Sequence, residues 1–370
     1  MSHVSTNSAC VPNQGPIGTV VLMYLHVSPH LARYPWGHQT QIGAWLHRVD
    51  IGAAAEAWFG THRSGSATLA DGSTLTEQLG GPVHALPWLA KLIAAAEPLS
   101  LQVHPSAAHA SARFVEQHPS YVDPFGKPEV LVALMSTVAL LGFDDIVSAT
   151  TRARSLGLTD LVDLLRDGPA AAATALWRDP QRSALISAAV AAASDDMLGL
   201  LAPVARRWAH DPFLAVACCL RPVRLAPGEA VEIEPGLVHA YLSGGGLEVM
   251  DASDNVLRGG LTAKPLDVDE LLVVLDPMAE PRFLTVPAAG RLATSSITAS
   301  VHRHARRATY PAPAFVWCTD GPMVASGPAS MRVDAGATFF VPEEAGSFTL
   351  AGGAAWVVAT PDATHDAAPV

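Results

Sequence analysis

The stretch ‘VRLAPGEAVEIEPGLVHAYLSGGGLEVMDA’ (223–252) decides the fold class of this chain. Apolar runs alternate with Pro-Gly pairs, and this pattern predicts strand, turn, strand, turn, strand. The same texture returns in ‘FVWCTDGP’ (315–322) and ‘MRVDAGATFFVPEEAGSFTLAGGAAWVVAT’ (331–360). The order of strands and turns over 226–241 recurs over 334–350, as two related β-barrels would produce. The sequence therefore predicts two β units.

A helical segment separates the early β-like runs from this stretch. ‘TDLVDLLRD’ (159–167) places its leucines on one helical face, with Thr159 and Asp160 as predicted caps. ‘SALISAAVAAASDDMLGLLAPVARRWA’ continues the helical pattern. Earlier in the chain, ‘LPWLAKLIAAA’ (86–96) also predicts a helix, whereas ‘VLVALMSTVALLGF’ (130–143) predicts either two buried strands or a strand and a turn.

We therefore expect a mainly β fold with an α-helical insertion. The first β domain is expected to comprise 23–146 and 221–265, interrupted by a helical insertion domain at 147–220. A disordered lead-in is expected at 1–22 and a second β domain at 266–370.

Composition excludes several classes of protein. The 370 residues carry a net charge of −11 with only 23 basic side chains, which argues against a nucleic-acid partner. The longest apolar run, 130–143, is shorter than the roughly 18–20 residues of a membrane span. No secretory signal pattern is present at the N-terminus. The four cysteines are too scattered for a disulfide scaffold: Cys10, Cys218, Cys219 and Cys318. We expect a cytoplasmic protein with neither a nucleic-acid nor a membrane partner.

Polar residues on a predicted strand indicate a site. In ‘EPLSLQVHPSA’ (97–107), Ser100, Gln102 and His104 share one face, opposite a face of apolar residues. Gln102 and His104 lie about 6–7 Å apart along such a strand, a spacing that suits two ligands of one metal ion. A hydrogen-bonded structural histidine is the alternative interpretation.

Two further segments supply possible ligands. Glu129 begins the apolar strand of ‘FGKPEVLVAL’ (125–134), where a carboxylate costs free energy unless it is exposed, paired or coordinated. An exposed strand start beside Lys127 is the alternative. His239 lies within a β-patterned run. Two histidines, a glutamate and a glutamine suit zinc, and the same set would accept iron, manganese or cobalt.

These segments carry a family resemblance. ‘YPWG’ (34–37), ‘AEAWFGTH’ (55–62), ‘LPWLAKL…EPLSLQVHPS’, ‘KPEVLVAL…LLGF’ and ‘GLVHAYLSGGGLEVMDASDNVLRGGLTAK’ resemble, in this order, the type I phosphomannose isomerases. The resemblance spans about residues 34–264. It implies a cupin jelly-roll catalytic domain with a helical insertion, and a second, cupin-like C-terminal domain. It also implies one zinc ion per chain, with four ligands: Gln102, His104, Glu129 and His239.

The resemblance further implies a zinc-dependent aldose–ketose isomerase of carbohydrate metabolism. Its members interconvert mannose 6-phosphate and fructose 6-phosphate by proton transfer through a cis-enediolate. The predicted catalytic residues are Arg258 and Lys127, and the predicted substrate-binding residues are Ser100, Asp254, Lys264 and Lys91. Solvated surface lysines, and a turn role for Asp254, are the alternatives. Glu248 and Asp254 are the carboxylates that would suit a proton shuttle or accept hydrogen bonds from sugar hydroxyls. We expect a monomer that binds a small sugar phosphate.

Two positions depart from the family pattern. Gly126 stands where a histidine is usual before the lysine of ‘KPE’, and Ala263 stands where a proline is usual. The first departure leaves the proton-transfer base open. A cupin iron oxygenase and a non-catalytic cupin that binds metal or sugar phosphate are the alternative functions. The remaining aromatic and histidine residues of this region are interpreted as core, barrel-rim, structural or exposed: Trp36, Trp45, Trp58, Trp88, His62, His84, His109 and His118.

Overall fold

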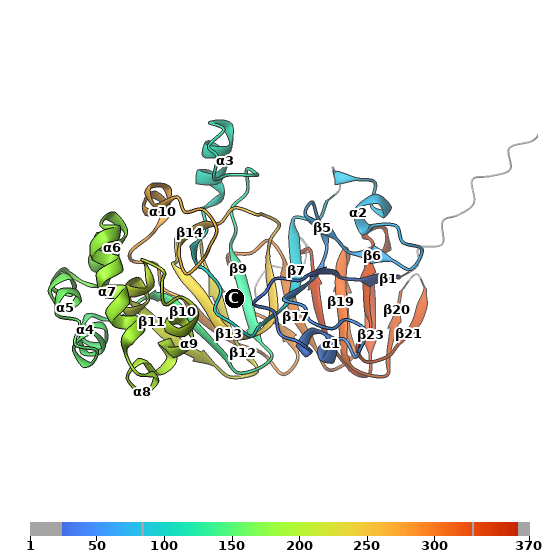
Figure 1. Ribbon diagram of the computed structural model, residues 1–370. Helices are drawn as coiled ribbons and strands as arrows, with labels where there is room; N and C mark the ends of the chain where they lie inside the picture. The colour runs from blue at the N-terminus through green and yellow to red at the C-terminus, as the bar shows by residue number, and fades with distance from the viewer. Residues whose placement is uncertain (1–23, 83–84, 328, 362–370) are drawn as a thin grey trace, which may run out of the picture.

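The computed structural model describes residues 24–82, 85–327 and 329–361. The expected lead-in (1–22) lies outside the described residues. Figure 1 shows a row of three parts, with a cluster of helices at one end, β-sheets in the middle and further β-sheets at the other end. The expected mainly β fold with a helical insertion is confirmed.

An eleven-stranded sheet forms the first β unit. Its main path runs β15-β12-β9-β13-β7-β3-β2, and four more strands pair off this path. The strands of the main path are β2 (His30–Ala32), β3 (Glu56–Phe59), β7 (Trp88–Ala95), β9 (Glu129–Ala133), β12 (Glu229–Ile233), β13 (His239–Asp251) and β15 (Arg282–Thr285). The others are β8 (Leu101–Val103), β10 (Thr137–Phe143), β11 (Leu220–Leu225) and β14 (Leu257–Gly260). β13 pairs with β7, β8, β9 and β10, and therefore joins both parts of the sheet.

The predicted helix at 86–96 is wrong, because this segment forms strand β7. All eight residues of Trp88–Ala95 are buried, and the strand pairs with β3 on one side and β13 on the other. A strand buried on both faces reads as a continuous apolar run, which periodicity alone does not separate from a helix. The two strands predicted within 130–143 are confirmed as β9 and β10.

The helical insertion lies between β10 and β11. Its elements are α4 (Ile146–Ser155), α5 (Thr159–Leu164), η2 (Leu165–Asp167), α6 (Pro169–Arg178), α7 (Pro180–Ala192), α8 (Asp195–Leu198), η3 (Gly199–Leu201), α9 (Ala202–Arg207) and η4 (Leu214–Cys219). The predicted helix at 159–167 is present, but its predicted caps are wrong. Leu158 is the N-cap residue, without a side-chain capping bond, because the helix begins one residue earlier than the polar pair suggests.

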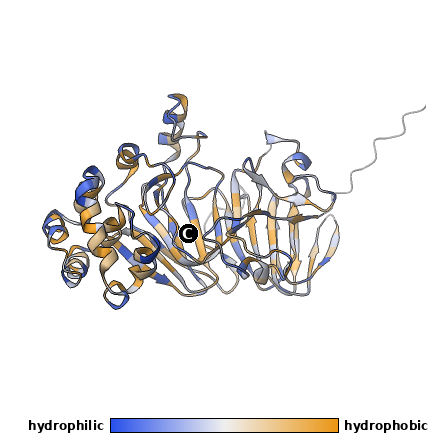
Figure 2. Cartoon of the chain, viewed as in Figure 1, coloured by the Kyte–Doolittle hydropathy of each residue, from blue (hydrophilic) through white to orange (hydrophobic). Residues whose placement is uncertain are grey.

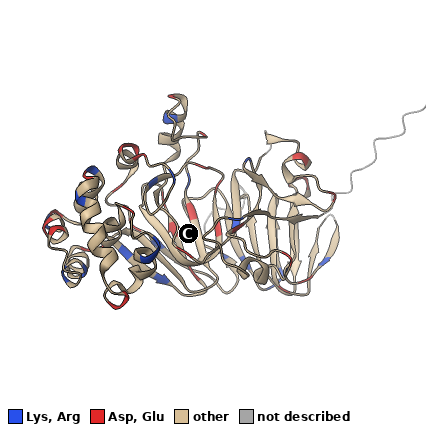
Figure 3. Ribbon diagram, viewed as in Figure 1, with Lys and Arg blue, Asp and Glu red and all other residues tan. Residues whose placement is uncertain are grey.

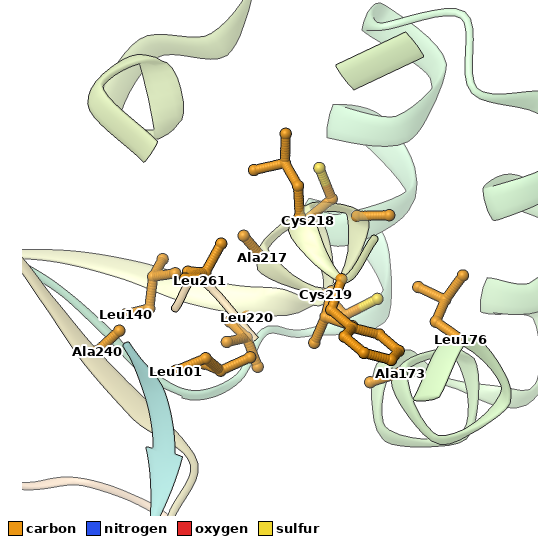
Figure 4. Packing of buried hydrophobic residues seen from close by; sticks show 14 of the residues in the cluster. Leu101, Leu140, Ala173, Leu176, Ala217, Cys218, Cys219, Leu220, Ala240 and Leu261 are labelled. Atoms are coloured by element: carbon orange, nitrogen blue, oxygen red, sulfur yellow. The ribbon is translucent and has the colours of Figure 1, made fainter. Parts of the chain in front are cut away.

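Cys218 and Cys219 lie where the insertion joins the first sheet. Both are buried at the end of η4. Figure 4 shows them between Leu101, Leu140 and Ala240 on the sheet side and Ala173 and Leu176 on the helical side. These residues belong to one continuous apolar core. The insertion is therefore packed onto the sheet rather than attached by its ends alone.

The second β unit consists of a seven-stranded and a four-stranded sheet. The larger contains β1 (Leu25–Ser28), β6 (Thr68–Leu69), β16 (Gly290–Arg291), β17 (Ser300–His304), β19 (Ala314–Asp320), β22 (Thr338–Val341) and β24 (Ala354–Ala359). The smaller contains β18 (Ala308–Pro311), β20 (Met323–Ser326), β21 (Ser330–Val333) and β23 (Ser347–Ala351). β1 comes from the beginning of the described chain and pairs with β22, so the two ends of the described chain share one sheet.

Apolar side chains fill the space between the two β units. Phe59 of β3 and Phe315 of β19 stack with ring centroids 4.4 Å apart, within one core that includes residues of both units. Figure 2 shows that hydrophobic residues, in orange, are frequent on the strands of both β units. Many of the hydrophilic residues, in blue, lie on helices and loops. The remaining elements are β4 (Thr61–His62), β5 (Gly65–Ser66), α1 (Gln41–Trp45), α2 (Leu75–Gln78), α3 (Ala107–Val115), α10 (Val268–Val274) and η5 (Glu343–Ala345).

Within the described residues, no single helix has both the length and the apolar composition of a membrane span. One pair, Pro180–Ala192 with Asp195–Arg207, meets that test only when the two are joined, and they are bent by 116° at the break.

One buried hydrogen bond ties the insertion to β14. Trp177 of α6 donates from Nε1 to the carbonyl oxygen of Gly259 at 2.7 Å. We predict that Trp177→Phe lowers the free energy of unfolding by about 1–3 kcal/mol, because the buried carbonyl loses its donor. Chemical denaturation measures this change. Trp208→Phe is the matched control, since the buried Trp208 Nε1 has no hydrogen-bond partner among the described residues. Equal effects of the two variants would contradict the prediction.

Candidate active site

Three buried side chains from three strands meet in the first sheet. His104 follows β8, Glu129 begins β9 and His239 begins β13. Each has one candidate ligand atom, and these atoms all lie within 4.8 Å of one another. His104 Nε2 lies 3.4 Å from Glu129 Oε2, and His239 Nε2 lies 3.3 Å from Glu129 Oε1. Figure 3 shows charged residues gathered on the strands at the middle of this sheet.

The hydrogen bonds of both imidazoles favour metal binding through Nε2. His104 Nδ1 donates to the carbonyl of Asn255 at 3.1 Å, and His239 Nδ1 donates to the carbonyl of Leu237 at 3.0 Å. These bonds place the proton on Nδ1, so each Nε2 presents a lone pair toward the cluster, as metal-binding histidines require. His239 Nε2 is buried and has no hydrogen-bond partner of acceptable geometry among the described residues. An unsatisfied acceptor in such a place fits a metal ligand.

Charge in this cluster is fixed by burial and by Lys127. Burial, with the neighbouring Lys127 charge, lowers the pKa of His104 to about 3, so its imidazole is neutral at physiological pH. Burial opposes ionisation of Glu129, yet Lys127 and His104 hold its pKa well below the usual range. The Lys127 ammonium donates to Glu129 Oε2 at 3.0 Å and to His104 Nε2 at 3.1 Å. The ionised carboxylate of Glu129 and the neutral imidazole of His104 therefore favour a positive charge between them, as a metal ion would supply.

Gln102 lies beside this cluster. It is opposite His239 in the pairing of β8 with β13 and opposite Arg258 in the pairing of β8 with β14. Directly opposite residues project from the same face of a sheet. Gln102 is therefore on the same side as His239 and lines the same cleft as Arg258.

A cleft of about 390 Å³ opens beside the cluster. Seven of the predicted site residues line it: Lys91, Ser100, Gln102, Lys127, Asp254, Arg258 and Lys264. His104, Glu129 and His239 are almost fully buried, and Lys127 connects them with the cleft. The structure thus brings all ten predicted residues into one region.

A chain of ionised groups crosses one wall of the cleft. Lys91 Nζ lies 3.5 Å from Glu248 Oε2, 3.7 Å from Glu56 Oε2 and 5.0 Å from the ring centroid of Trp58. Burial disfavours the charge of Lys91, but the two carboxylates raise its pKa overall. Burial and the charge of Glu129 raise the pKa of Glu248 to about 7. A carboxyl group of this kind exchanges a proton near neutral pH.

Another part of the cleft has positive charge without acidic partners. Among the described residues, no carboxylate lies within ion-pair distance of Arg258 or Lys264. Burial lowers the pKa of Arg258, and burial with the Arg258 charge lowers the pKa of Lys264. The Lys264 ammonium lies 5.5 Å from the ring centroid of Tyr34. Glu56 and Asp254 act on Lys264 only from beyond ion-pair distance, and two neighbouring cations without a directly bound carboxylate favour an anionic ligand.

Asp254 and His62 form a contact that the sequence did not predict. His62 Nε2 lies 3.5 Å from Asp254 Oδ1, and Ser64 Oγ donates to Asp254 Oδ2 at 2.8 Å. His62 is buried, which agrees with its interpretation as a structural residue. The β4–β5 hairpin thus fixes the orientation of the Asp254 carboxylate at the cleft.

Several residues that line the cleft were not predicted as site residues. Three of them lie on strands: Glu56, Trp58 and Tyr241. Glu56 could have been recognised from the sequence, because a carboxylate at the start of an apolar strand requires a partner or a function. Arg207 and Trp208 come from the helical insertion. No local pattern near residue 207 indicates a site, because its proximity to the cleft depends on how the insertion packs.

The structure explains Gly126. A Cβ atom at this position would lie 2.6 Å from the backbone nitrogen of Ala107, where α3 begins. The backbone at the start of α3 therefore occupies the space that any side chain at residue 126 would need. Glycine stands in place of the usual histidine where these two backbone segments approach each other closely.

We predict that His239→Ala weakens divalent metal binding by at least about 100-fold, because a convergent imidazole ligand is lost. Competition with a chromogenic chelator, using zinc, measures this affinity. His118→Ala is the control, since His118 lies outside the cluster. Unchanged zinc affinity in His239→Ala would show that these residues do not form the metal site.

Comparisons with known proteins agree with this geometry. A family model described as phosphomannose isomerase type I, catalytic domain, matches residues 24–146. Mannose-6-phosphate isomerase of Salmonella typhimurium is 30% identical over 295 residues, which cover 69% of this chain and 75% of that protein. The Escherichia coli K12 protein of the same name is 29% identical over 296 residues, with the same coverage of 69% and 75%.

Solved structures share the fold. Zinc-bound mannose 6-phosphate isomerase has a TM-score of 0.78 at 22% identity, covering 92% of this chain and 100% of that one. A Salmonella typhimurium mannose 6-phosphate isomerase bound to fructose 6-phosphate and zinc gives the same values. The fold of this chain is therefore that of the cupin enzymes with this name. By fold and by sequence, the chain belongs to the type I phosphomannose isomerase family, the mannose-6-phosphate isomerases.

Proposed function

We propose that this chain is a zinc-dependent aldose–ketose isomerase that interconverts mannose 6-phosphate and fructose 6-phosphate. The observation that carries the proposal is one cleft that combines two kinds of group. Convergent, buried metal ligands lie beside it, and Arg258 and Lys264, with no carboxylate at ion-pair distance among the described residues, line it. A sugar phosphate has the matching features, a carbonyl with adjacent hydroxyls and a terminal dianion.

His104, Glu129 and His239, with Gln102, would hold the zinc ion. The set of two imidazoles, one carboxylate and one amide is of the kind that zinc accepts. Bound zinc would supply a Lewis acid that polarises the sugar carbonyl. Lys127, which lines the cleft beside these ligands, would add fixed positive charge as the negative charge of the enediolate develops.

Glu248 is our candidate for the proton-transfer base. It lines the cleft, is buried, and its pKa of about 7 lies near the pH at which the enzyme would work. A base with such a pKa accepts a proton from one carbon and returns it to the next without a large driving-force penalty. Glu248 would thus act in the role left open by Gly126, while Asp254 and Ser100 would bind sugar hydroxyls.

Arg258 and Lys264 are our candidates for the phosphate, and Lys91 would hold Glu248 and Glu56 in place. A phosphate between Arg258 and Lys264 would neutralise two partly buried charges that repel one another. This arrangement separates recognition from chemistry: Lys264→Ala should raise KM for mannose 6-phosphate more than it lowers kcat.

We predict that the purified chain converts mannose 6-phosphate to fructose 6-phosphate, that a chelator removes this activity, and that zinc restores it. A coupled assay for fructose 6-phosphate measures the rate. Free mannose serves as the control substrate, and its kcat/KM should be at least about 100-fold lower, because it lacks the charge-assisted bonds to the phosphate.

The alternatives give different results in the same assay. A non-catalytic cupin would bind mannose 6-phosphate without turnover in a folded, zinc-loaded sample. An iron oxygenase would consume dioxygen only when loaded with iron, and the two cleft cations would have no evident role. Either result would overturn the isomerase proposal.

We predict that Glu248→Gln lowers kcat by roughly 10²–10⁴-fold with little change in KM, because the amide preserves shape but does not take up a proton. Steady-state kinetics give both constants. Glu280→Gln is the matched control, since Glu280 is exposed and pairs with Arg221, and neither residue lines the cleft. If kcat is retained in Glu248→Gln, another group is the base.

We also propose that the enzyme is a cytoplasmic monomer that binds a small sugar phosphate and neither nucleic acid nor membrane. The division at residues 146 and 220 is likewise proposed, whereas the expected boundary at 265 is moved beyond β15, because β15 pairs with β12 of the first sheet. Light scattering during size-exclusion chromatography tests the monomer, and cell fractionation tests the location. Limited proteolysis tests the boundaries, and we expect the first cleavages to occur near these positions.

A further inference from the structure

A second cavity lies between the two β units, away from the cleft. Its volume is about 370 Å³, and it shares no lining residue with the cleft. Its walls come from α1 and the loop after it, from Leu134 and Gly228 of the first unit, and from β17, β19 and β24 of the second. Figure 1 shows α1 beside β17 and β19 at the lower edge of the molecule.

Arg303 supplies positive charge to this cavity. Nη1 of Arg303 donates to Thr319 Oγ1 at 2.9 Å and to the carbonyl of Ala355 at 3.3 Å. Nε and Nη2 make no hydrogen bond to any described residue, and no described carboxylate lies within ion-pair distance of the guanidinium. Burial lowers the pKa of Arg303, and the charge of Asp320 acts against this shift. One edge of the planar guanidinium, formed by Nε and Nη2, is therefore available to a bidentate anion.

The lining residues favour an anion rather than a cation. None of the ten carries a carboxylate, and His47 and Thr319 add further polar groups to Arg303. His47 has a φ of 52°, which is uncommon for a residue other than glycine. Its Cβ and the carbonyl of Leu46 pack on Gly336, where a Cβ would lie 2.6–2.8 Å from them. The loop that presents His47 is thus held against the second β unit in an unfavourable backbone conformation.

Three tryptophans form the aromatic part of the wall. Trp45 belongs to α1, Trp317 to β19 and Trp356 to β24. The Arg303 guanidinium lies 5.3 Å from the ring centroid of Trp356, so the charge and an aromatic face are adjacent. The buried Trp317 Nε1 has no hydrogen-bond partner among the described residues. Aromatic faces next to a partly free guanidinium suit a ligand that has both a ring and an anionic group.

We propose that this cavity is a second ligand site, separate from the isomerase cleft, for a small compound with one ring and one phosphate or carboxylate group. Arg303 binds the anionic group through Nε and Nη2, and the ring packs against the tryptophan wall. The volume is near the lower limit of ligand pockets and limits the ligand to about one ring with its substituents. Because the cavity touches both β units, bound ligand would link them.

Isothermal titration of the full-length, zinc-loaded chain tests the proposal with three probes: glucose 6-phosphate, benzoate and inorganic phosphate. Each titration is repeated in the Lys264→Ala background, which weakens phosphate binding in the cleft, and only binding that persists in this background is assigned to the second cavity. We expect Arg303→Ala to weaken binding of at least one ring anion by tenfold or more, with kcat/KM for mannose 6-phosphate within twofold of the wild type. Loss of glucose 6-phosphate binding would identify a phosphate ligand, and loss of benzoate binding a carboxylate ligand.

A second variant and a control make the result decisive. Trp45→Ala keeps the charge but removes part of the aromatic wall, so it should weaken the ring anion and leave inorganic phosphate unchanged. Arg332→Ala, on the exposed surface of β21, is the matched control and should change nothing. Equal affinity of the wild type and Arg303→Ala for both ring anions, or no binding of either, would overturn the proposal. Inorganic phosphate that binds as tightly as the ring anions would also overturn it.

Discussion

The catalytic β unit depends on compensation of one buried charge. Glu129 is 1% exposed, and an ionised carboxylate in such a position is strongly unfavourable without partners. The Lys127 ammonium is its charged partner, and Nε2 of His104 and of His239 face it at 3.4 and 3.3 Å, where a bound metal ion would add positive charge. Because these residues directly follow β8, begin β13 and directly precede β9, the cluster forms only when these strands pair in their observed register. The requirement for charge balance and the requirement for a metal site are therefore met by the same side chains, and any slip of a strand would remove both.

β13 connects the metal end of the cleft with the proposed base. This strand has 13 residues, with His239 at its start and Glu248 near its end. Halfway along it, a Cβ at Gly245 would lie 1.9 Å from the carbonyl oxygen of Ile93, and one at Gly246 would lie 1.8 Å from that of Val132. Only glycine permits so close an approach of the neighbouring strands on both sides. The strand is thus held rigidly between β7 and β9, and its two functional residues are fixed relative to each other.

Much of this arrangement is local enough to be predicted from the sequence, and the rest depends on packing. The alternation in 97–107 correctly separates polar from apolar residues, because a strand places every second side chain on one face. The same logic fails for 86–96, since a strand that is buried on both sides loses its alternation, and its alanines and leucines favour helix in isolation. The metal ligands are recognisable because charged or imidazole groups inside apolar strands require an explanation. The place of Arg207 in the cleft and the second cavity cannot be recognised in the sequence, because both depend on segments that meet only in the folded chain.

The helical insertion is part of the active-site construction rather than an appendage. Arg207 and Trp208 close one side of the cleft, and Trp177 binds the carbonyl of Gly259, the residue after Arg258. Arg258 has no acidic partner among the described residues, so its position is set by its backbone and by packing rather than by an ion pair. An unpaired arginine held in this way retains its hydrogen-bond donors for substrate, whereas an ion-paired one would first have to give up its partner. The insertion therefore holds β14 in place through the bond from Trp177 to Gly259. This contact helps to keep the partly buried guanidinium of Arg258 available in the cleft.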